Sequence, residues 1–206
     1  MMPDREGAPP RAWQRMLSGR RLDLLDPSPL DIEIGDIAHG LARVARWNGQ
    51  TFGDHAFSVA QHSLLVEEIF SAIFVRASAA ECLAALLHDA AEYVIGDMIS
   101  PFKSVVGGGY KEVERRLQRA VHIRFGLPSE AAEATRKAIK RADQIAAYFE
   151  ATELAGFSVT EAVRYFGRPR GIAAGRFDFT PRPVRSVEKA FLKRFEGIEA
   201  LRAKSL

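Results

Sequence analysis

Four side chains that can bind a metal ion occur at three separate places in the chain: His62, the adjacent pair His88 and Asp89, and Asp143. Two imidazoles and two carboxylates form a donor set that suits Mn, Fe, Co, Ni, Zn or Mg, with water completing an octahedron. A divalent ion held there would bind a phosphoryl oxygen, neutralise its charge and lower the pKa of a bound water. The residue types therefore indicate metal-assisted hydrolysis, provided that the fold brings the three places together.

Glu92 follows His88 by four residues and Asp89 by three. On a continuous helix this spacing places Glu92 on the same face, one turn along, where a carboxylate could orient or deprotonate a water, or protonate a leaving oxygen. The apolar residues of this segment cluster on the opposite side of the helical wheel: Leu83, Leu86, Leu87, Ala90 and Val94. An ordinary amphipathic helix that exposes its polar face to water fits this pattern equally well.

The segments that carry these residues are expected to be helices. Apolar periodicity and turn residues predict helices over about 36–48 with Asp36 as N-cap, 57–74, 79–95 ending at Gly96, 110–125, 130–154 with Ser129 as cap, and 183–204. The segment 156–163 is left open between helix and strand. No convincing run of alternating strands is present, so the predicted fold class is all-α, a compact irregular helical bundle.

Two of the candidate ligands lie on apolar faces of these predicted helices. His62 shares a stripe with Val59 and Val66, and Asp143 lies four residues after Ile139 on a core-facing stripe. A buried carboxylate without a partner costs several kcal/mol, so such a residue is usually paired, protonated or bound to a metal. Spacing alone leaves two interpretations open: metal ligands, or a core histidine together with a structural ion pair from Asp143 to the neighbouring Lys140 or Arg141.

Length and composition predict a single domain over 1–206, with a core at about 36–154 and a basic loop and helix at 155–206. The region 162–206 holds 11 Lys and Arg against 4 Asp and Glu, but its last helix has apolar residues at helical spacing, which favours core packing over nucleic-acid binding. Cys82 is the only cysteine, which excludes an intrachain disulfide and a Cys-rich zinc site. No membrane span or signal peptide is recognised, so a cytoplasmic setting is expected.

The sequence resembles the HD-domain metal-dependent phosphohydrolases, and within them the YfbR-like 5′-deoxynucleotidase branch. The resemblance rests on the H…HD…D spacing and on three blocks, "FSVAQHS", "LLHDAAEYVIGDMISPFK" and "KRADQIAAYFEA", preceded by "RW" at 46–47. It covers about 36–154, and it implies a bundle of the HD type with one divalent metal ion. An N-terminal extension and the basic C-terminal region do not align with this branch.

The resemblance implies that His62, His88, Asp89 and Asp143 are the metal ligands and that Glu92 is the catalytic carboxylate. The implied reaction cleaves a phosphate monoester, a (deoxy)ribonucleoside 5′-monophosphate, to nucleoside and phosphate. Relatives are often dimers, so a homodimer is a further expectation. No membrane partner is expected.

Substrate contacts are implied for four more residues. Arg46 would hold the 5′-phosphate, Trp47 would pack on sugar or base, Asp97 would have a catalytic role or position substrate or water, and Lys103 would add positive charge. Three of them also have an ordinary structural interpretation: Arg46 as a surface arginine, Trp47 as a core aromatic and Asp97 as a turn residue.

Three other functions are weighed against this hypothesis. An HD phosphodiesterase or a nucleoside di- or triphosphate hydrolase would use the same metal ligands on another ester. A non-catalytic nucleotide-binding HD module would have no need of Glu92. A nucleic-acid-binding protein would use the basic C-terminal region, and it ranks last because no recognition motif accompanies those charges.

Overall fold

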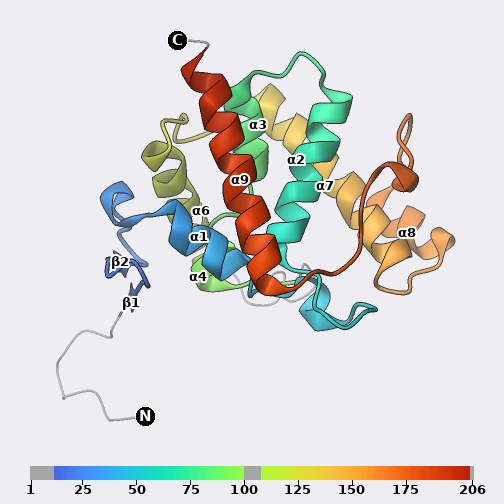
Figure 1. The fold of residues 1–206 in the computed structure, drawn as a ribbon, viewed down its shortest axis with the longest axis horizontal. Coiled ribbons are helices and arrows are strands. Elements are labelled where there is room, and N and C mark those ends of the chain that lie inside the picture. The colour runs from blue at the N-terminus through green and yellow to red at the C-terminus, as the bar shows by residue number, and fades with distance from the viewer. Residues whose placement is uncertain (1–11, 100–107, 205–206) are drawn as a thin grey trace.

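A computed structural model describes residues 12–99 and 108–204 of the chain (Figure 1). The described residues are predominantly helical, which confirms the predicted fold class. The helices are α1 (Ile34–Leu41), α2 (Val59–Ile73), α3 (Ala79–Leu86), α4 (Glu92–Ile95), α6 (Gly108–Arg124), α7 (Glu133–Glu153), α8 (Val159–Phe166) and α9 (Val184–Ala203). The short 3-10 segments are η1 (Pro29–Asp31), η2 (Arg46–Gly49) and η3 (Ala174–Arg176). A small antiparallel hairpin, β1 (Trp13–Arg15) and β2 (Arg21–Asp23), precedes the helices where the sequence predicted no strand, and it pairs Trp13 with Asp23.

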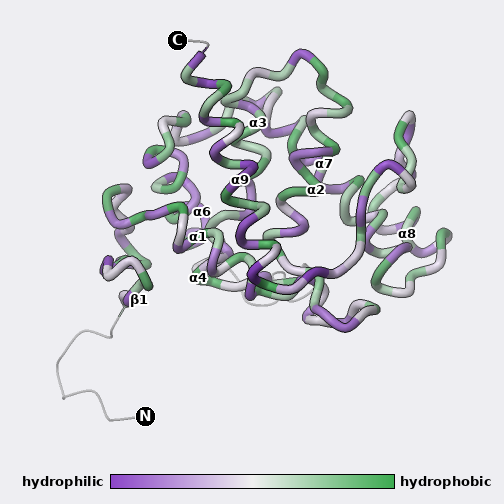
Figure 2. The backbone as a smooth tube through the Cα atoms, in the orientation of Figure 1, coloured by the Kyte–Doolittle hydropathy of each residue, from purple (hydrophilic) through white to green (hydrophobic). Residues whose placement is uncertain are grey.

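Helix α2 packs on α1, α3, α7 and α9. In Figure 1, α9 runs across the front of the bundle, and it packs on α1, α2 and α3, while α7 packs on α2 and carries α8 on its other side. Figure 2 shows hydrophilic and hydrophobic residues alternating along α9, as expected for a helix with one buried stripe. The buried residues of that stripe are Val187, Phe191, Phe195 and Ile198. Core packing of the basic C-terminal helix is therefore confirmed.

The helix predicted over 79–95 is interrupted. Helix α3 ends at Leu86 and α4 begins at Glu92, so a turn over 87–91 separates them. Within the turn, the amide of Ala90 donates to Leu87 O at 3.0 Å, and the amide of Glu92 donates to Asp89 O at 3.0 Å. These bonds span three residues rather than the four of an α-helix, so the helical-wheel argument for the face of His88 and Glu92 is wrong.

Two predicted helix caps are also wrong. Asp36 lies inside α1, where its buried carboxylate accepts hydrogen bonds from the amide and the hydroxyl of Ser18. Helix α7 begins after Ala132, with no side-chain cap, rather than at Ser129. The segment left open between helix and strand forms α8, which begins with a reciprocal capping box between Ser158 and Glu161.

The long helices place the predicted core face of α2 and α7 inside the bundle. Ser58 caps α2 by accepting from the amide of Gln61, so the helix begins one turn before His62. No helix among the described residues is long and apolar enough to cross a membrane. The single-domain organisation over 1–206 stays a prediction.

Candidate metal centre and active site

The fold brings the three places in the sequence together at one point. His62 on α2 is fully buried, and its Nε2 lies 3.3 Å from Asp143 Oδ1 on α7 and 3.5 Å from Asp89 Oδ2. Nε2 of His88 lies 3.1 Å from the same oxygen of Asp89. One donor atom each of His62, His88 and Asp143 lies within 4.8 Å of the other two, and Asp89 touches both imidazoles.

The two imidazoles are oriented alike, with Nδ1 bonded to the protein and Nε2 turned to the shared centre. Nδ1 of His88 lies 2.9 Å from Ala85 O, and Nδ1 of His62 lies 2.5 Å from Glu150 Oε1. Among the described residues, both Nε2 atoms are buried without a well-directed hydrogen bond, because their carboxylate neighbours are close but not aligned for one. Buried nitrogens held this way beside carboxylates fit a site for a divalent cation.

The electrostatics of the cluster favour positive charge at its centre. Burial opposes ionisation of Asp89, but the imidazoles beside it outweigh burial and hold the pKa of its carboxyl well below the ordinary value. Asp143 has a lowered pKa for the same reasons. Burial and the Arg46 guanidinium oppose protonation of His62, but the surrounding carboxylates outweigh both and raise its pKa well above the ordinary value. A site that favours a charged imidazole also favours a cation.

The structural interpretation of Asp143 as an ion-pair partner is correct for one of its two oxygens. Lys140 Nζ lies 2.6 Å from Asp143 Oδ2 on the outer side of α7. The other oxygen, Oδ1, faces His62. The lysine therefore leaves one carboxylate oxygen of Asp143 in the cluster.

Glu150 is part of the site, although the sequence assigned it no role. Its side chain is fully buried, and besides His62 its carboxylate accepts from Trp47 Nε1 at 2.9 Å and from Arg46 Nε at 3.3 Å. Burial raises its pKa, but His62 and Arg46 outweigh burial and lower it. Glu150 follows Asp143 by seven residues, two helical turns, and this spacing on an apolar stripe was the signal that could have identified it.

The predicted substrate residues surround Glu150. Arg46 Nη1 lies 2.9 Å from Asp97 Oδ2, and the Trp47 ring lies 5.5 Å from Phe157 and 5.9 Å from Phe166, centroid to centroid. Trp47 adopts a left-handed backbone conformation with φ of 55°, which directs its indole back to Glu150. Lys103 lies outside the described residues.

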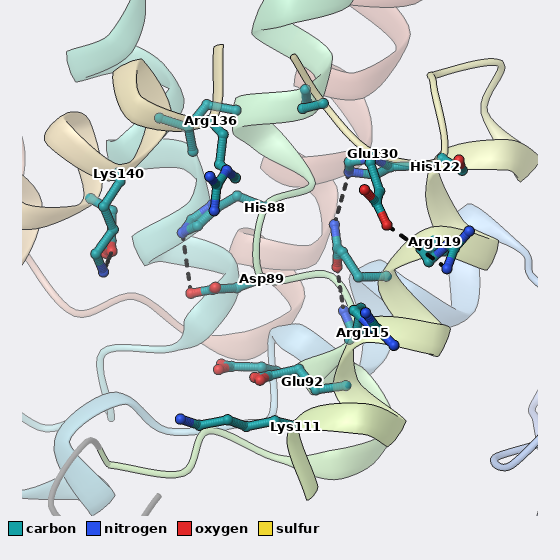
Figure 3. Close-up of a pocket in the computed structure, with 18 of the residues that line it drawn as sticks. His88, Asp89, Glu92, Lys111, Arg115, Arg119, His122, Glu130, Arg136 and Lys140 are labelled. Carbon is teal, nitrogen blue, oxygen red and sulfur yellow. Dashed lines mark hydrogen bonds and ion pairs between the residues drawn. The ribbon is translucent and has the colours of Figure 1, made fainter. Parts of the chain in front are cut away.

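A pocket of about 720 Å³ opens beside the cluster, between α6, α7 and the turn that carries His88 (Figure 3). His88, Asp89, Glu92 and Asp143 line it, and the buried carboxylate of Glu92 lies beside Lys111 in the view. Charged side chains of both signs line the rest of it, with Lys111, Arg115, Arg119, Arg136 and Lys140 against Glu114, Glu130 and Glu133. None of the residues around Glu150 is among the described residues that line this pocket. Burial opposes the charge of Arg46, but the carboxylates of Glu150, Asp97, Asp89 and Asp143 outweigh burial and raise its pKa, so this group borders the same metal cluster from another side.

An irregular helical bundle that gathers a histidine, a His-Asp pair and an aspartate at one point defines the class of HD-domain phosphohydrolases. The model of the family described as 5′-deoxynucleotidase YfbR-like matches residues 37–157, more than half of the chain. The protein belongs to this family. It is also similar to an uncharacterized protein of Rhodobacter capsulatus, with 58% identity over 184 residues that cover 89% of this chain and 94% of the relative.

Proposed function

We propose that this protein is a metal-dependent phosphohydrolase that cleaves a nucleoside 5′-monophosphate, with a deoxyribonucleotide preferred, to nucleoside and phosphate. The observation that carries the proposal is the position of Glu92. The residue is 3% exposed and lines the same pocket as His88, Asp89 and Asp143. The pocket volume of about 720 Å³ lies within the range of about 300–1,000 Å³ that is usual for small-molecule sites, which leaves room for a nucleotide.

The divalent ion would be held by His62, His88, Asp89 and Asp143, and when bound it supplies charge neutralisation and an acidified water. Glu92 holds the attacking water by a hydrogen bond and accepts its proton. Asp97 and Glu150 fix the guanidinium of Arg46. Arg46, Trp47 and Asp97, with Lys103, are proposed to contact the substrate.

Phosphate release tests this function directly. Purified protein is given a panel of deoxyribonucleoside and ribonucleoside 5′-monophosphates with Mn, Co, Mg, Fe, Ni or Zn. Glu92→Gln is expected to lower kcat by about 10²–10⁴-fold, the usual contribution of a positioned acid or base, with metal binding retained. His88→Ala is expected to lose both metal binding and turnover.

Glu196→Gln, on the exposed face of α9, makes the same chemical change away from the pocket and is the matched control. Metal-dependent turnover that persists in both Glu92→Gln and His88→Ala would refute the assignment. Tight nucleotide binding without turnover under every metal would identify the protein as a nucleotide-binding HD module instead.

A second candidate is a nucleoside di- or triphosphate hydrolase, or a phosphodiesterase. Among the described residues, five basic side chains line the pocket beyond the metal centre against three glutamates, and this excess of positive charge favours a substrate with more than one phosphate. The same panel, extended to di- and triphosphates and cyclic dinucleotides, separates these activities by their products. The cytoplasmic setting and the homodimer stay predictions alongside this proposal.

A further inference from the structure

The break between α3 and α4 is occupied by a side chain from another helix. In a continuous α-helix, the amide of Ala91 would donate to Leu87 O, four residues earlier. Here both of these backbone groups are hydrogen-bonded to the side-chain amide of Gln118 on α6. Its Nε2 donates to Leu87 O at 2.7 Å, and its Oε1 accepts from the amide of Ala91 at 3.3 Å.

Insertion of a side chain into the hydrogen-bond ladder is a recognised cause of a helix break. The two backbone groups that Gln118 holds are the ends of the turn 87–91. His88 and Asp89 lie between those ends, and Glu92 follows directly. Three residues of the proposed active site therefore lie within or next to a turn whose two ends are both bonded to one amide from α6.

His122 fixes the orientation of that amide. It lies one turn along α6, is 8% exposed, and its Nδ1 donates to Pro128 O at 3.0 Å, which leaves Nε2 as an acceptor. Nε2 lies 3.1 Å from Gln118 Nε2 and accepts its second hydrogen. Both hydrogens and the oxygen of the Gln118 amide are thereby used, so a flip of the amide would lose all three bonds.

We propose that Gln118 is a positioning residue that holds the turn 87–91 open as a metal-binding loop, and that His122 sets its orientation. The catalytic consequence rests on the proposed function, whereas the effect on metal affinity does not. Without this amide, Leu87 O and Ala91 N can bond to each other, which would extend the helix and redirect His88 and Asp89.

The test is the affinity of metal-stripped protein for Mn²⁺ alone, measured by calorimetry for the wild type and Gln118→Met. Methionine preserves the length of the side chain and removes its three hydrogen bonds. Loss of an outer partner of metal ligands costs about 10- to 100-fold in metal affinity or activity, and a loss of this size in Mn²⁺ affinity is expected here. If the protein hydrolyses nucleotides, kcat at saturating substrate is expected to fall in parallel.

Gln14→Met, on the exposed strand β1, is the matched control, and thermal melting is recorded for every variant. A lower melting temperature with wild-type Mn²⁺ affinity would overturn the proposal, because it would show a purely structural role. If Gln118→Met does not fold, the same measurement is made on His122→Asn. A smaller loss of Mn²⁺ affinity is expected for this variant, and an unchanged affinity would overturn the proposal. A wild type that binds Mn²⁺ but cleaves no ester would refute the proposed function and leave this test intact.

Discussion

The two halves of the metal centre are built in different ways. His62 and Asp143 lie within α2 and α7, helices of 15 and 21 residues that are regular on both sides of the ligand. His88 and Asp89 lie in a turn where a helix has been interrupted, and a residue of α6 holds that turn from outside. Nδ1 of His62 is bonded to Glu150, which lies on α7 itself, two turns from Asp143.

This difference shows which parts of the site are fixed by local structure. On α2 and α7, helical periodicity alone turns the ligands inward, so packing of the two helices assembles that half. On the turn, the local sequence favours a helix, and the observed backbone needs the contact with Gln118. The first half should therefore respond to mutation as part of the core, and the second half as a loop with an external support.

Removal of one ligand from each half is expected to have the largest effect on function and to separate the halves in stability. His62→Ala and His88→Ala should each lower metal affinity by more than about 100-fold, beyond the effect of losing an outer partner. In chelator, His62→Ala should lower the free energy of unfolding by about 3 kcal/mol, because it removes one partner of a buried ion pair. His88→Ala should lower it by about 1 kcal/mol, the value of one hydrogen bond.

Denaturant unfolding monitored by fluorescence measures the stability, and Mn²⁺ titration measures the affinity. His55→Ala, at an exposed position before α2, is the control for both. If His62→Ala and His88→Ala lowered the free energy of unfolding equally, the distinction between a ligand in the core and a ligand in a loop would be contradicted.

Glu150→Gln tests the contact between the Glu150 carboxylate and His62, which joins the two helices α2 and α7. The amide preserves the shape but removes the charge that orients His62 and balances Arg46, so metal affinity should fall by about 10- to 100-fold. Glu153→Gln, three residues along α7 and exposed, is the matched control. Calorimetric titration of both variants with Mn²⁺ makes the comparison, and a Glu150→Gln affinity equal to that of the control would show that His62 needs no anionic partner.

The same distinction explains what could be predicted from the sequence. The helical class, the buried stripes of α2 and α9, and the inward orientation of His62 and Asp143 follow from the spacing of apolar residues, which records local geometry. Family resemblance supplied the pairing of His88 and Asp89 with these ligands. Helical periodicity across 79–95 was misleading, because the break there is imposed by a residue more than 25 positions away, and no local pattern records it.

Glu150 and Gln118 were missed for related reasons. Each makes its decisive contacts with residues far away in the chain, with 104 positions between Arg46 and Glu150 and 31 between Leu87 and Gln118. The seven-residue spacing from Asp143 points to the face of Glu150 but does not identify its partners. Such contacts become visible only when the packing of the helices is known.

The smallest expected effect is on the pH dependence of the free energy of unfolding, and it comes from His122, which orients the Gln118 amide that holds the turn 87–91. Burial lowers the pKa of His122, so the folded protein resists a proton that the unfolded chain accepts below about pH 6.5. Well above pH 6.5, His122 is neutral in both states and does not change the free energy of unfolding. As the pH falls below about 6.5, the unfolded chain gains this proton first, and the free energy of unfolding decreases by at most about 1.4 kcal/mol per pH unit.

His122→Asn removes this titration while leaving the other ionisable groups in place, so wild type and variant differ only in this contribution to the slope. The difference in unfolding free energy between them should change in favour of the variant between pH 7.5 and pH 5.5, measured by urea unfolding in chelator. His55→Asn makes the same substitution at an exposed position and is the matched control. A difference that is constant across this range would mean that His122 accepts a proton as readily in the folded protein as in the unfolded chain. Below about pH 6.5 its Nε2 would then carry a hydrogen and could not accept one from Gln118, so the amide that holds the turn would lose this support in that pH range.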